Sequence, residues 1–254
     1  MLKILAVTAW MAGFAGAQTT VCKTLAPDAQ DAMIASPANH TVLFEDADVR
    51  VLDVHSAPHT KETPHTHRLP GVMYFVQQGA GTMNTPEDPA GISHPADSNF
   101  KPYVKAVAPQ GLHWTENTGD VPFHAIRVEF KHPGCGLPGW KTAVPAANDA
   151  VVAAPANHTV LFENDDVRVL DVHLAPGAKE PWHTHPWPGF FYVIATPPLR
   201  FYQPGKTPEP RGFPAGAKVV PIGAQGLHAA ENVGDFPLHM IRFELKFGQA
   251  APTP

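Results

Sequence analysis

An internal repeat constrains the fold of this chain more than any other feature of its sequence. The segment PANHTVLFE at residues 37–45 returns unchanged at 155–163, 118 positions later. The similarity continues for about forty residues, fades after residue 80, and resumes where QGLH at 110–113 returns at 225–228. The offset there is 115, so a loop has absorbed a difference of three residues. We therefore expect two copies of one small unit rather than a single large domain.

Proline and glycine interrupt the sequence too often for long helices. The 254 residues include 29 Pro and 20 Gly, spread along the whole chain. Both residues disfavour helix interiors. Two β-branched runs, Thr41–Glu45 and Val49–Val54, flank the turn-forming segment Asp46–Asp48 and predict a hairpin, and Val72–Gln77 predicts another strand. Many short strands in units of this size indicate an all-β fold of two small sandwich or jelly-roll barrels.

The last strand of the first unit, residues 124–131, alternates in character. Ile126 and Val128 fall on one face, whereas Arg127 and Glu129 fall on the other. This pattern predicts one buried face and one wetter face. We also expect each of the two barrels to have a core of its own.

Residues 1–17 indicate a signal peptide. A short basic start precedes the apolar stretch Ile4–Phe14, and small residues at 15–17 suit cleavage before the next residue. The alternative is a buried first strand or helix. We expect a periplasmic or secreted protein without a stable membrane anchor. In an oxidising compartment Cys22 and Cys135 most simply form one disulfide, although two free thiols remain the alternative.

Charge is sparse and histidine is abundant. Charged residues make up 16% of the chain, the formal net charge is −5, and the lysines and arginines are scattered. This argues against a nucleic-acid partner, which needs a concentrated basic surface. The 15 histidines exceed what surface or core positions usually require. Metal binding is the first explanation to test.

A His-Thr-His motif stands in each unit and predicts a metal chelate. Residues i and i+2 of a strand point to the same face, so both imidazoles can bind one ion. A third histidine follows 46 residues after the motif in the first unit and 43 residues after it in the second. Three imidazoles leave coordination positions open for water or substrate. The predicted ligands are His65, His67 and His113 in the first unit and His183, His185 and His228 in the second. We expect a divalent transition metal, Fe, Mn, Cu or Zn, with up to two ions per chain.

The other repeated histidines are expected to have structural roles. His124 is expected to be a hydrogen-bonded core residue, with an inward-facing role beside the metal as the alternative. His40 stands where a strand begins, and His55 is expected to pair with Asp53. The same roles are expected for the counterparts His239, His158, His173 and Asp171.

At this point the sequence resembles the cupin superfamily. His65–Gly79 is similar to its first motif and Pro109–Asn117 to its second, which returns in the second unit except that Ala224 replaces the proline. In both units the spacing from glycine to histidine is one residue shorter than usual. The resemblance implies two tandem double-stranded β-helix (jelly-roll) barrels, each with metal inside its open end. It divides the chain into a first cupin domain at 31–132, a Pro/Gly/Ala-rich linker at 133–150, a second cupin domain at 151–247 and a tail at 248–254.

The sequence departs from the family at the usual metal-binding glutamate. Counting five residues past the second histidine of each motif gives Val72 and Phe190, which cannot bind a metal. Losing that carboxylate would leave the ion a stronger Lewis acid. The pattern is similar to three-histidine thiol, diketone and gentisate dioxygenases, and it argues against oxalate decarboxylase activity. Glu62 and Glu180 precede the first ligand by three residues and are expected to face away from it.

The resemblance implies several functions for a small-molecule partner. A metal-dependent enzyme of dioxygenase or isomerase type, acting on a small chelating anion, is the leading hypothesis. A zinc hydrolase and a non-catalytic metal- or ligand-binding protein are alternatives, and the oligomeric state is left open. Most aromatic residues near the sites are expected to be core residues, and the second site is the more hydrophobic.

Overall fold

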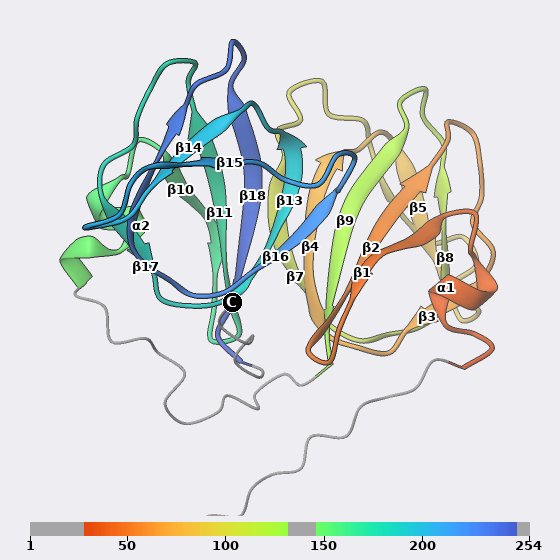
Figure 1. The fold of residues 1–254 in the computed structure, drawn as a ribbon. Coiled ribbons are helices and arrows are strands. Elements are labelled where there is room, and N and C mark those ends of the chain that lie inside the picture. Colours follow the sequence, from red (N-terminus) through yellow and green to blue (C-terminus); the bar gives the residue numbers. More distant parts are fainter. Residues whose placement is uncertain (1–27, 132–145, 248–254) are drawn as a thin grey trace, which may run out of the picture.

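The computed structural model describes residues 28–131 and 146–247, which form two β-barrels side by side (Figure 1). The elements of the first barrel are α1 (Ala32–Ala35), β1 (His40–Glu45), β2 (Val49–Ser56), β3 (His65–His67), β4 (Gly71–Gln77), β5 (Gly81–Asn84), β6 (Ile92–His94), β7 (Tyr103–Val107), β8 (Gln110–Asn117) and β9 (Phe123–Phe130). The elements of the second are η1 (Ala146–Asn148), α2 (Ala150–Ala153), β10 (His158–Glu163), β11 (Val167–Leu174), β12 (His183–His185), β13 (Gly189–Ala195), β14 (Leu199–Tyr202), β15 (Glu209–Arg211), β16 (Val219–Ile222), β17 (Gln225–Asn232) and β18 (Leu238–Leu245).

Each barrel is a jelly roll made of two antiparallel sheets. In the first barrel a five-stranded sheet has the order β1-β2-β9-β4-β7 and a four-stranded sheet the order β3-β8-β5-β6. The second barrel repeats this as β10-β11-β18-β13-β16 and β12-β17-β14-β15. The predicted all-β fold and hairpin are confirmed: β1 pairs with β2, and Asp46 Oδ1 accepts the backbone N–H groups of Asp48 and Val49 in the turn.

A single helical turn precedes the first strand of each barrel. In α1 the side chain of Asp31 caps the N-terminus by accepting the N–H of Met33, and the helix stops at Ser36 because Pro37 follows. Asp31 Oδ2 also lies 3.0 Å from Arg50 Nη2 on β2, which ties the turn to the barrel. Asp149 makes the same contacts before α2. These turns bring the histidine at the start of β1 or β10 over the barrel interior.

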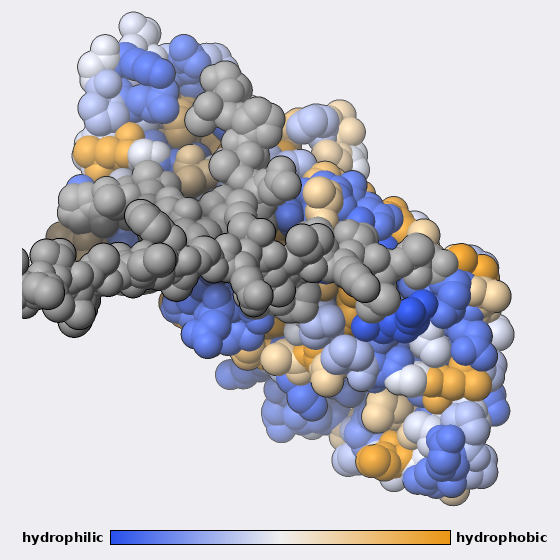
Figure 2. Space-filling view, turned by 90° about the horizontal axis from the view of Figure 1, so that it is seen from below, coloured by the Kyte–Doolittle hydropathy of each residue, from blue (hydrophilic) through white to orange (hydrophobic). Residues whose placement is uncertain are grey.

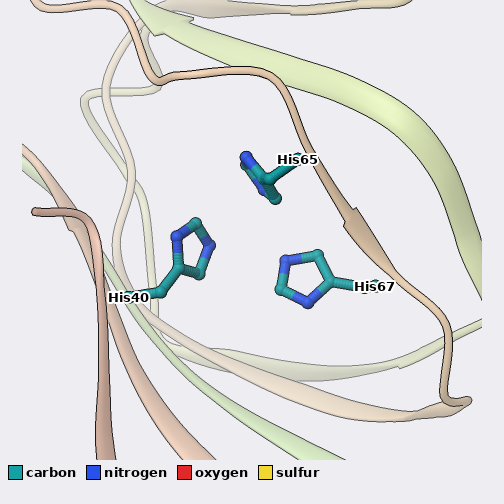
Figure 3. A group of neighbouring side chains, drawn as sticks. All are labelled: His40, His65 and His67. Carbon is teal, nitrogen blue, oxygen red and sulfur yellow. The ribbon is translucent and has the colours of Figure 1, made fainter. Parts of the chain in front are cut away.

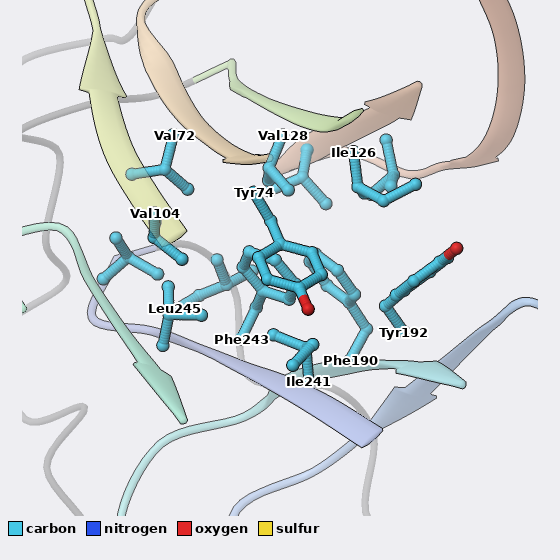
Figure 4. Packing of buried hydrophobic residues seen from close by; sticks show 14 of the residues in the cluster. Val72, Tyr74, Val104, Ile126, Val128, Phe190, Tyr192, Ile241, Phe243 and Leu245 are labelled. Carbon is cyan, nitrogen blue, oxygen red and sulfur yellow. The ribbon is translucent and has the colours of Figure 1, made fainter. Parts of the chain in front are cut away.

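The two five-stranded sheets pack against each other and form one core between the barrels. Figure 4 shows side chains of β4, β7 and β9 meeting those of β13 and β18. Tyr74 and Tyr192 lie with ring centroids 6.5 Å apart across this boundary, and Phe130 and Phe247 with centroids 4.9 Å apart. The expectation of separate cores is therefore wrong for this cluster, whereas a second cluster, which includes Leu174, Phe191 and Met240, lies within the second barrel alone. Each unit has an apolar outer sheet face that only the other unit covers.

The prediction of a wetter face on the last strand is also wrong. Ile126 and Val128 on β9 belong to the core between the barrels, whereas Arg127 and Glu129 point into the first barrel and are 2% and 0% exposed. The predicted alternation of side chains between the two faces of this strand was correct, but both faces are buried. The charged face tolerates burial because its side chains pair with one another.

Several sequence predictions fall outside the described residues. These are the signal peptide at 1–17, both cysteines, most of the linker at 133–150 and the tail at 248–254. The described part of the second unit begins at Ala146. Among the described residues no helix has the length and apolarity needed to cross a membrane. On the uncovered part of the face seen in Figure 2, hydrophobic residues lie in small separate groups among hydrophilic ones.

Candidate metal centres

Four histidines converge inside the first barrel. His65 and His67 come from β3, and His113 on β8 pairs directly with His65 in the sheet register. Their ring centroids are 4.5 to 5.6 Å apart. His40, at the start of β1, adds a fourth ring 4.5 Å from that of His65 and 5.1 Å from that of His67. Figure 3 shows His40, His65 and His67 pointing toward one another.

Hydrogen bonds orient these rings so that Nε2 faces the centre. His65 Nδ1 lies 2.8 Å from the carbonyl of Thr63, and His113 Nδ1 lies 2.8 Å from that of Gly111. His40 Nδ1 lies 3.2 Å from the carbonyl of Ser36. A carbonyl can only accept, so each Nδ1 carries the hydrogen and each Nε2 keeps a lone pair. This is the tautomer that metal-binding histidines need.

Burial keeps the imidazoles neutral. It lowers the pKa of His40 to about 3, helped by the nearby His65, and it also lowers the pKa values of His65, His67 and His113. A buried imidazole resists protonation because a charged ring loses its hydration. The cluster therefore offers neutral nitrogen donors at pH 7, a set that suits divalent transition metals.

The second barrel repeats the centre. His183 and His185 on β12, His228 on β17 and His158 at the start of β10 have ring centroids 4.3 to 5.5 Å apart. The Nδ1 atoms of His183 and His228 each lie 2.8 Å from a backbone carbonyl, that of Pro181 and that of Gly226. His185 Nδ1 lies 2.7 Å from Glu244 Oε1, and His158 Nδ1 lies 3.3 Å from the carbonyl of Ala154. Burial lowers the pKa to about 4 for His183 and to about 3 for His158 and His228.

The structure brings the rings of the six predicted histidines together in two sets of three and adds one ring to each. The ligand atoms that lie within 4.8 Å of one another belong to a smaller set in the first barrel, without His113, and to two overlapping sets in the second, one of which is Glu180, His183 and His228. His40 and His158 were expected only to begin strands, yet His40 joins His65 and His67, and His158 joins its own motif. The signal was present in the sequence, because both stand in the repeated segment PANHTVLFE. The place of β1 beside the barrel mouth could not be read from spacing.

A buried carboxylate holds the second histidine of each motif. In the first barrel Glu129 Oε1 lies 2.8 Å from His67 Nδ1, and Arg127 Nε donates to the same oxygen at 3.2 Å. Arg50 Nε donates to the other oxygen at 2.6 Å. The second barrel has the same arrangement in Glu244, His185, Arg242 and Arg168. A carboxylate behind a ligand histidine fixes the ring and raises its basicity.

Architecture and histidine placement together decide the fold family. Two jelly-roll barrels lie in tandem, and each carries its histidine motif on a short strand of the smaller sheet, facing the interior. The fold is that of a bicupin. No family model and no curated protein sequence matches the chain.

The solved structures to which this chain is similar are distant from it in sequence. A cupin domain from Bordetella pertussis is 22% identical over 36% of this chain and 91% of its own, with a TM-score of 0.30. AerE from Microcystis aeruginosa is 11% identical over 82% and 97%, with a TM-score of 0.49. The oxalate decarboxylase of Lactobacillus farciminis is 14% identical over 85% and 79%, with a TM-score of 0.42. The fold assignment therefore rests on strand order and histidine placement.

The position expected for the cupin glutamate does not face the metal centre. Val72 is fully buried in the core between the barrels, as is Phe190 at 1% exposure. The neighbours Met73 and Phe75 on β4 point into the barrel instead. A side chain at Gly71 is excluded as well, because its Cβ would lie 1.8 Å from the carbonyl oxygen of Val128. The motif count thus selected the wrong face of β4.

The expectation that Glu62 and Glu180 face away from the histidines is wrong. Glu180 Oε1 lies 3.8 Å from His183 Nε2, and burial raises the pKa of Glu180 to about 7. Glu62 lines the first cavity, where its two oxygens accept the Ser56 hydroxyl and the Thr115 N–H. The segment before each motif is irregular rather than a strand, so alternation did not apply.

The two barrel interiors differ in volume. A cavity of about 470 Å³ in the first barrel reaches the four histidines and includes Met73, Phe75 and Tyr103 in its lining. In the second barrel the cavity that reaches the four histidines is about 60 Å³, and another of about 230 Å³ is lined by His228 and Phe201. Phe201 stacks on His228 there with ring centroids 5.1 Å apart. This aromatic contact agrees with the expectation of a more hydrophobic second site. Phe190 and Tyr192, however, do not contribute to that site, because they face the core between the barrels.

Proposed function

We propose that this bicupin is a metal-dependent enzyme whose first barrel binds a small organic anion against the metal. The observation that carries the proposal is the pairing of an open cavity of about 470 Å³ with four neutral imidazoles and a buried arginine. A cavity of that size accommodates a small molecule. The buried cation favours one that carries a carboxylate or enolate.

Arg127 supplies the cationic contact for such an anion. Its Nε donates to Glu129 and its Nη1 donates to Gln110 Oε1 at 2.7 Å. Its Nη2 is buried and has no hydrogen-bond partner among the described residues. In the second barrel the equivalent Nη2, of Arg242, lies 3.5 Å from the carbonyl of Trp187. The guanidinium of Arg127 belongs to the lining of the cavity, and its positive charge favours a bound carboxylate.

The protein side of the reaction follows from these positions. His40, His65, His67 and His113 would hold an Fe, Mn, Cu or Zn ion, and the ion would supply Lewis acidity and, if redox-active, oxygen chemistry. Arg127 orients the anion, while Met73 and Phe75 keep the apolar side of the cavity dry. Chemistry of dioxygenase or isomerase type on a chelating anion fits this arrangement.

The second barrel suits a metal-binding role without turnover. The cavity that reaches its four histidines is about 60 Å³, against about 470 Å³ in the first barrel, and Phe201 stacks on His228. We propose a second, retained ion there, which makes two barrel ions per chain.

Anion binding to the metal-loaded protein tests the proposal. Diketonates and hydroxybenzoates should shift the spectrum of the bound ion in the parent and in the His183→Asn/His185→Asn variant. The shift should be lost in His65→Asn/His67→Asn. Elemental analysis should find one barrel ion fewer in each double variant than in the parent. A shift that survives loss of the first-barrel histidines, or the absence of any shift, contradicts the proposal.

We also propose that the mature protein acts in the periplasm or outside the cell. The support is the signal-peptide pattern at residues 1–17. Intact mass of protein recovered from its native compartment should correspond to a chain beginning at Gln18. It should rise by two hydrogens on reduction of a Cys22–Cys135 disulfide, and a full-length mass contradicts export.

A further inference from the structure

A second type of histidine cluster lies outside the barrels. In the second unit Asp171 Oδ1 lies 3.0 Å from His173 Nε2 and 2.9 Å from His239 Nε2. The two imidazoles stack with ring centroids 3.9 Å apart. The ion pair of Asp171 with His173 agrees with the sequence expectation. The expected inward-facing alternative for His239 is wrong, because its side chain lies on the outer face of the sheet.

The strands place all three donors on one face. His173 on β11 pairs directly with His239 on β18, and Asp171 stands two residues before His173. Directly opposite residues bring their Cβ atoms within about 5 Å, and residues two apart share a face. The arrangement is built into strand register and does not depend on a loop.

The donor distances fit one small cation. One ligand atom from each of the three residues lies within 4.8 Å of the others. Two atoms that each bind zinc at about 2 Å are roughly 3 Å apart, close to the separations of Nε2 from Oδ1. The side chains are 26% to 50% exposed, so an ion can reach them from solvent.

We propose that Asp171, His173 and His239 form an accessory divalent-metal site, most suited to Zn²⁺, at the boundary between the barrels. Two imidazoles and one carboxylate are a common zinc donor set with a position left for water. The triad continues the rows of side chains that build the shared core, since Val167, Val169 and Asp171 alternate along β11. An ion there would link β11 to β18 at the end of that core.

The first barrel faces this site. Burial, and next the charge of Asp171, raises the pKa of Tyr74 to about 12, although Tyr74 belongs to the other barrel. An ion bound at Asp171 would therefore neutralise the carboxylate whose charge reaches Tyr74 in the other barrel. Its role would be structural, holding β11 and β18 of the second unit together at the end of the shared core.

The first unit provides a matched control. Asp53 lies 2.8 Å from His124 Nε2, and His55 stands opposite His124 in the register. No contact of His55 with that carboxylate is found among the described residues, so the three donors do not converge. The same three residue types occupy equivalent strands in both units, but only in the second unit are they already placed to bind one ion.

Zinc uptake by the full mature chain tests the site independently of the barrels. After equilibrium dialysis against Zn²⁺, His173→Ala and Asp171→Asn should each hold one ion fewer than the parent, whereas His55→Ala should match the parent. His65→Asn/His67→Asn should lose a barrel ion and keep this one. Circular dichroism and barrel-metal content show whether each variant is folded. Zinc content equal to the parent in His173→Ala and Asp171→Asn, or the same loss in His55→Ala, overturns the proposal.

Discussion

At the scale of single residues, the buried carboxylates of Glu129 and its counterpart Glu244 combine two roles, orienting a histidine and pairing with arginines. Glu129 is completely buried and is surrounded by three donors, from His67, Arg127 and Arg50. One carboxylate therefore orients a metal ligand and compensates two guanidinium groups. Removing one partner of such a buried network costs more than the network contributes as a whole, because the remaining charges lose their compensation.

Replacing Glu129 by Gln is expected to weaken metal binding in the first barrel about 10–100-fold, because His67 loses its charged acceptor. Glu244→Gln should do the same in the second barrel and leave the first unchanged. Competition with a chromophoric chelator measures both affinities. Equal effects of either variant on both sites would contradict this one-barrel role.

The buried histidines also make stability depend on pH. Burial lowers the pKa of His40, His158 and His228 to about 3 and that of His183 to about 4, from an ordinary value of 6.5. The unfolded chain therefore binds more protons between those values, so stability falls as pH falls below 6.5. Glu180, with its pKa raised to about 7, acts in the opposite direction between pH 4.5 and 7. The four histidines outweigh it.

The metal-free protein should therefore lose about 3–4 kcal/mol of unfolding free energy per pH unit between pH 6 and 5. Urea unfolding at several pH values measures this. The metal-loaded protein should resist acid better, since the ion competes with protons for the same nitrogens. A metal-free form whose stability is flat across this range would contradict the neutral assignment of the rings.

At the scale of elements, β4 separates the two environments that matter most. Its odd-numbered residues Met73 and Phe75 line the first cavity, whereas Val72 and Tyr74 pack in the core between the barrels. Neighbouring positions on one strand thus control ligand binding and barrel association separately.

Glutamate at these two neighbouring positions should have different consequences. Val72→Glu places an unpaired carboxylate in a dry core and should reduce the free energy of unfolding by about 3–5 kcal/mol. Met73→Glu should leave the protein folded and weaken anion binding in the first cavity, because the new charge repels the ligand. Urea unfolding and anion titration compare the two. Anion binding by Met73→Glu equal to the parent would contradict the assigned cavity.

At the scale of the whole molecule, the barrels share their largest apolar cluster. It contains Val72 and Val128 from one unit and Phe190 and Phe243 from the other. Neither unit can bury this surface alone, so the stability of each depends on the other.

The metal-free chain is therefore expected to unfold in one transition. Phe190→Ala should lower the stability of both barrels together, by about 3–5 kcal/mol, because it leaves a cavity at their common core. Calorimetry should give equal calorimetric and van't Hoff enthalpies. Two separate transitions, or loss of the second barrel alone in Phe190→Ala, would show independent domains.

The repeat and the periodicity of the sequence were enough to predict the all-β class, two tandem barrels and six histidines in two sets. These features are local or repeated: strand alternation follows from neighbouring residues, and the His-Thr-His chelate follows from the pleat of one strand. The tertiary structure alone decided the rest. It placed His40 and His158 in the two histidine clusters and buried Val72 in the core between the barrels. It also placed Glu180 beside His183 in the second cluster. It also placed one large apolar cluster between the barrels, because pairing between distant strands and contact between sheets determine which face of a strand is buried, and sequence spacing does not record either.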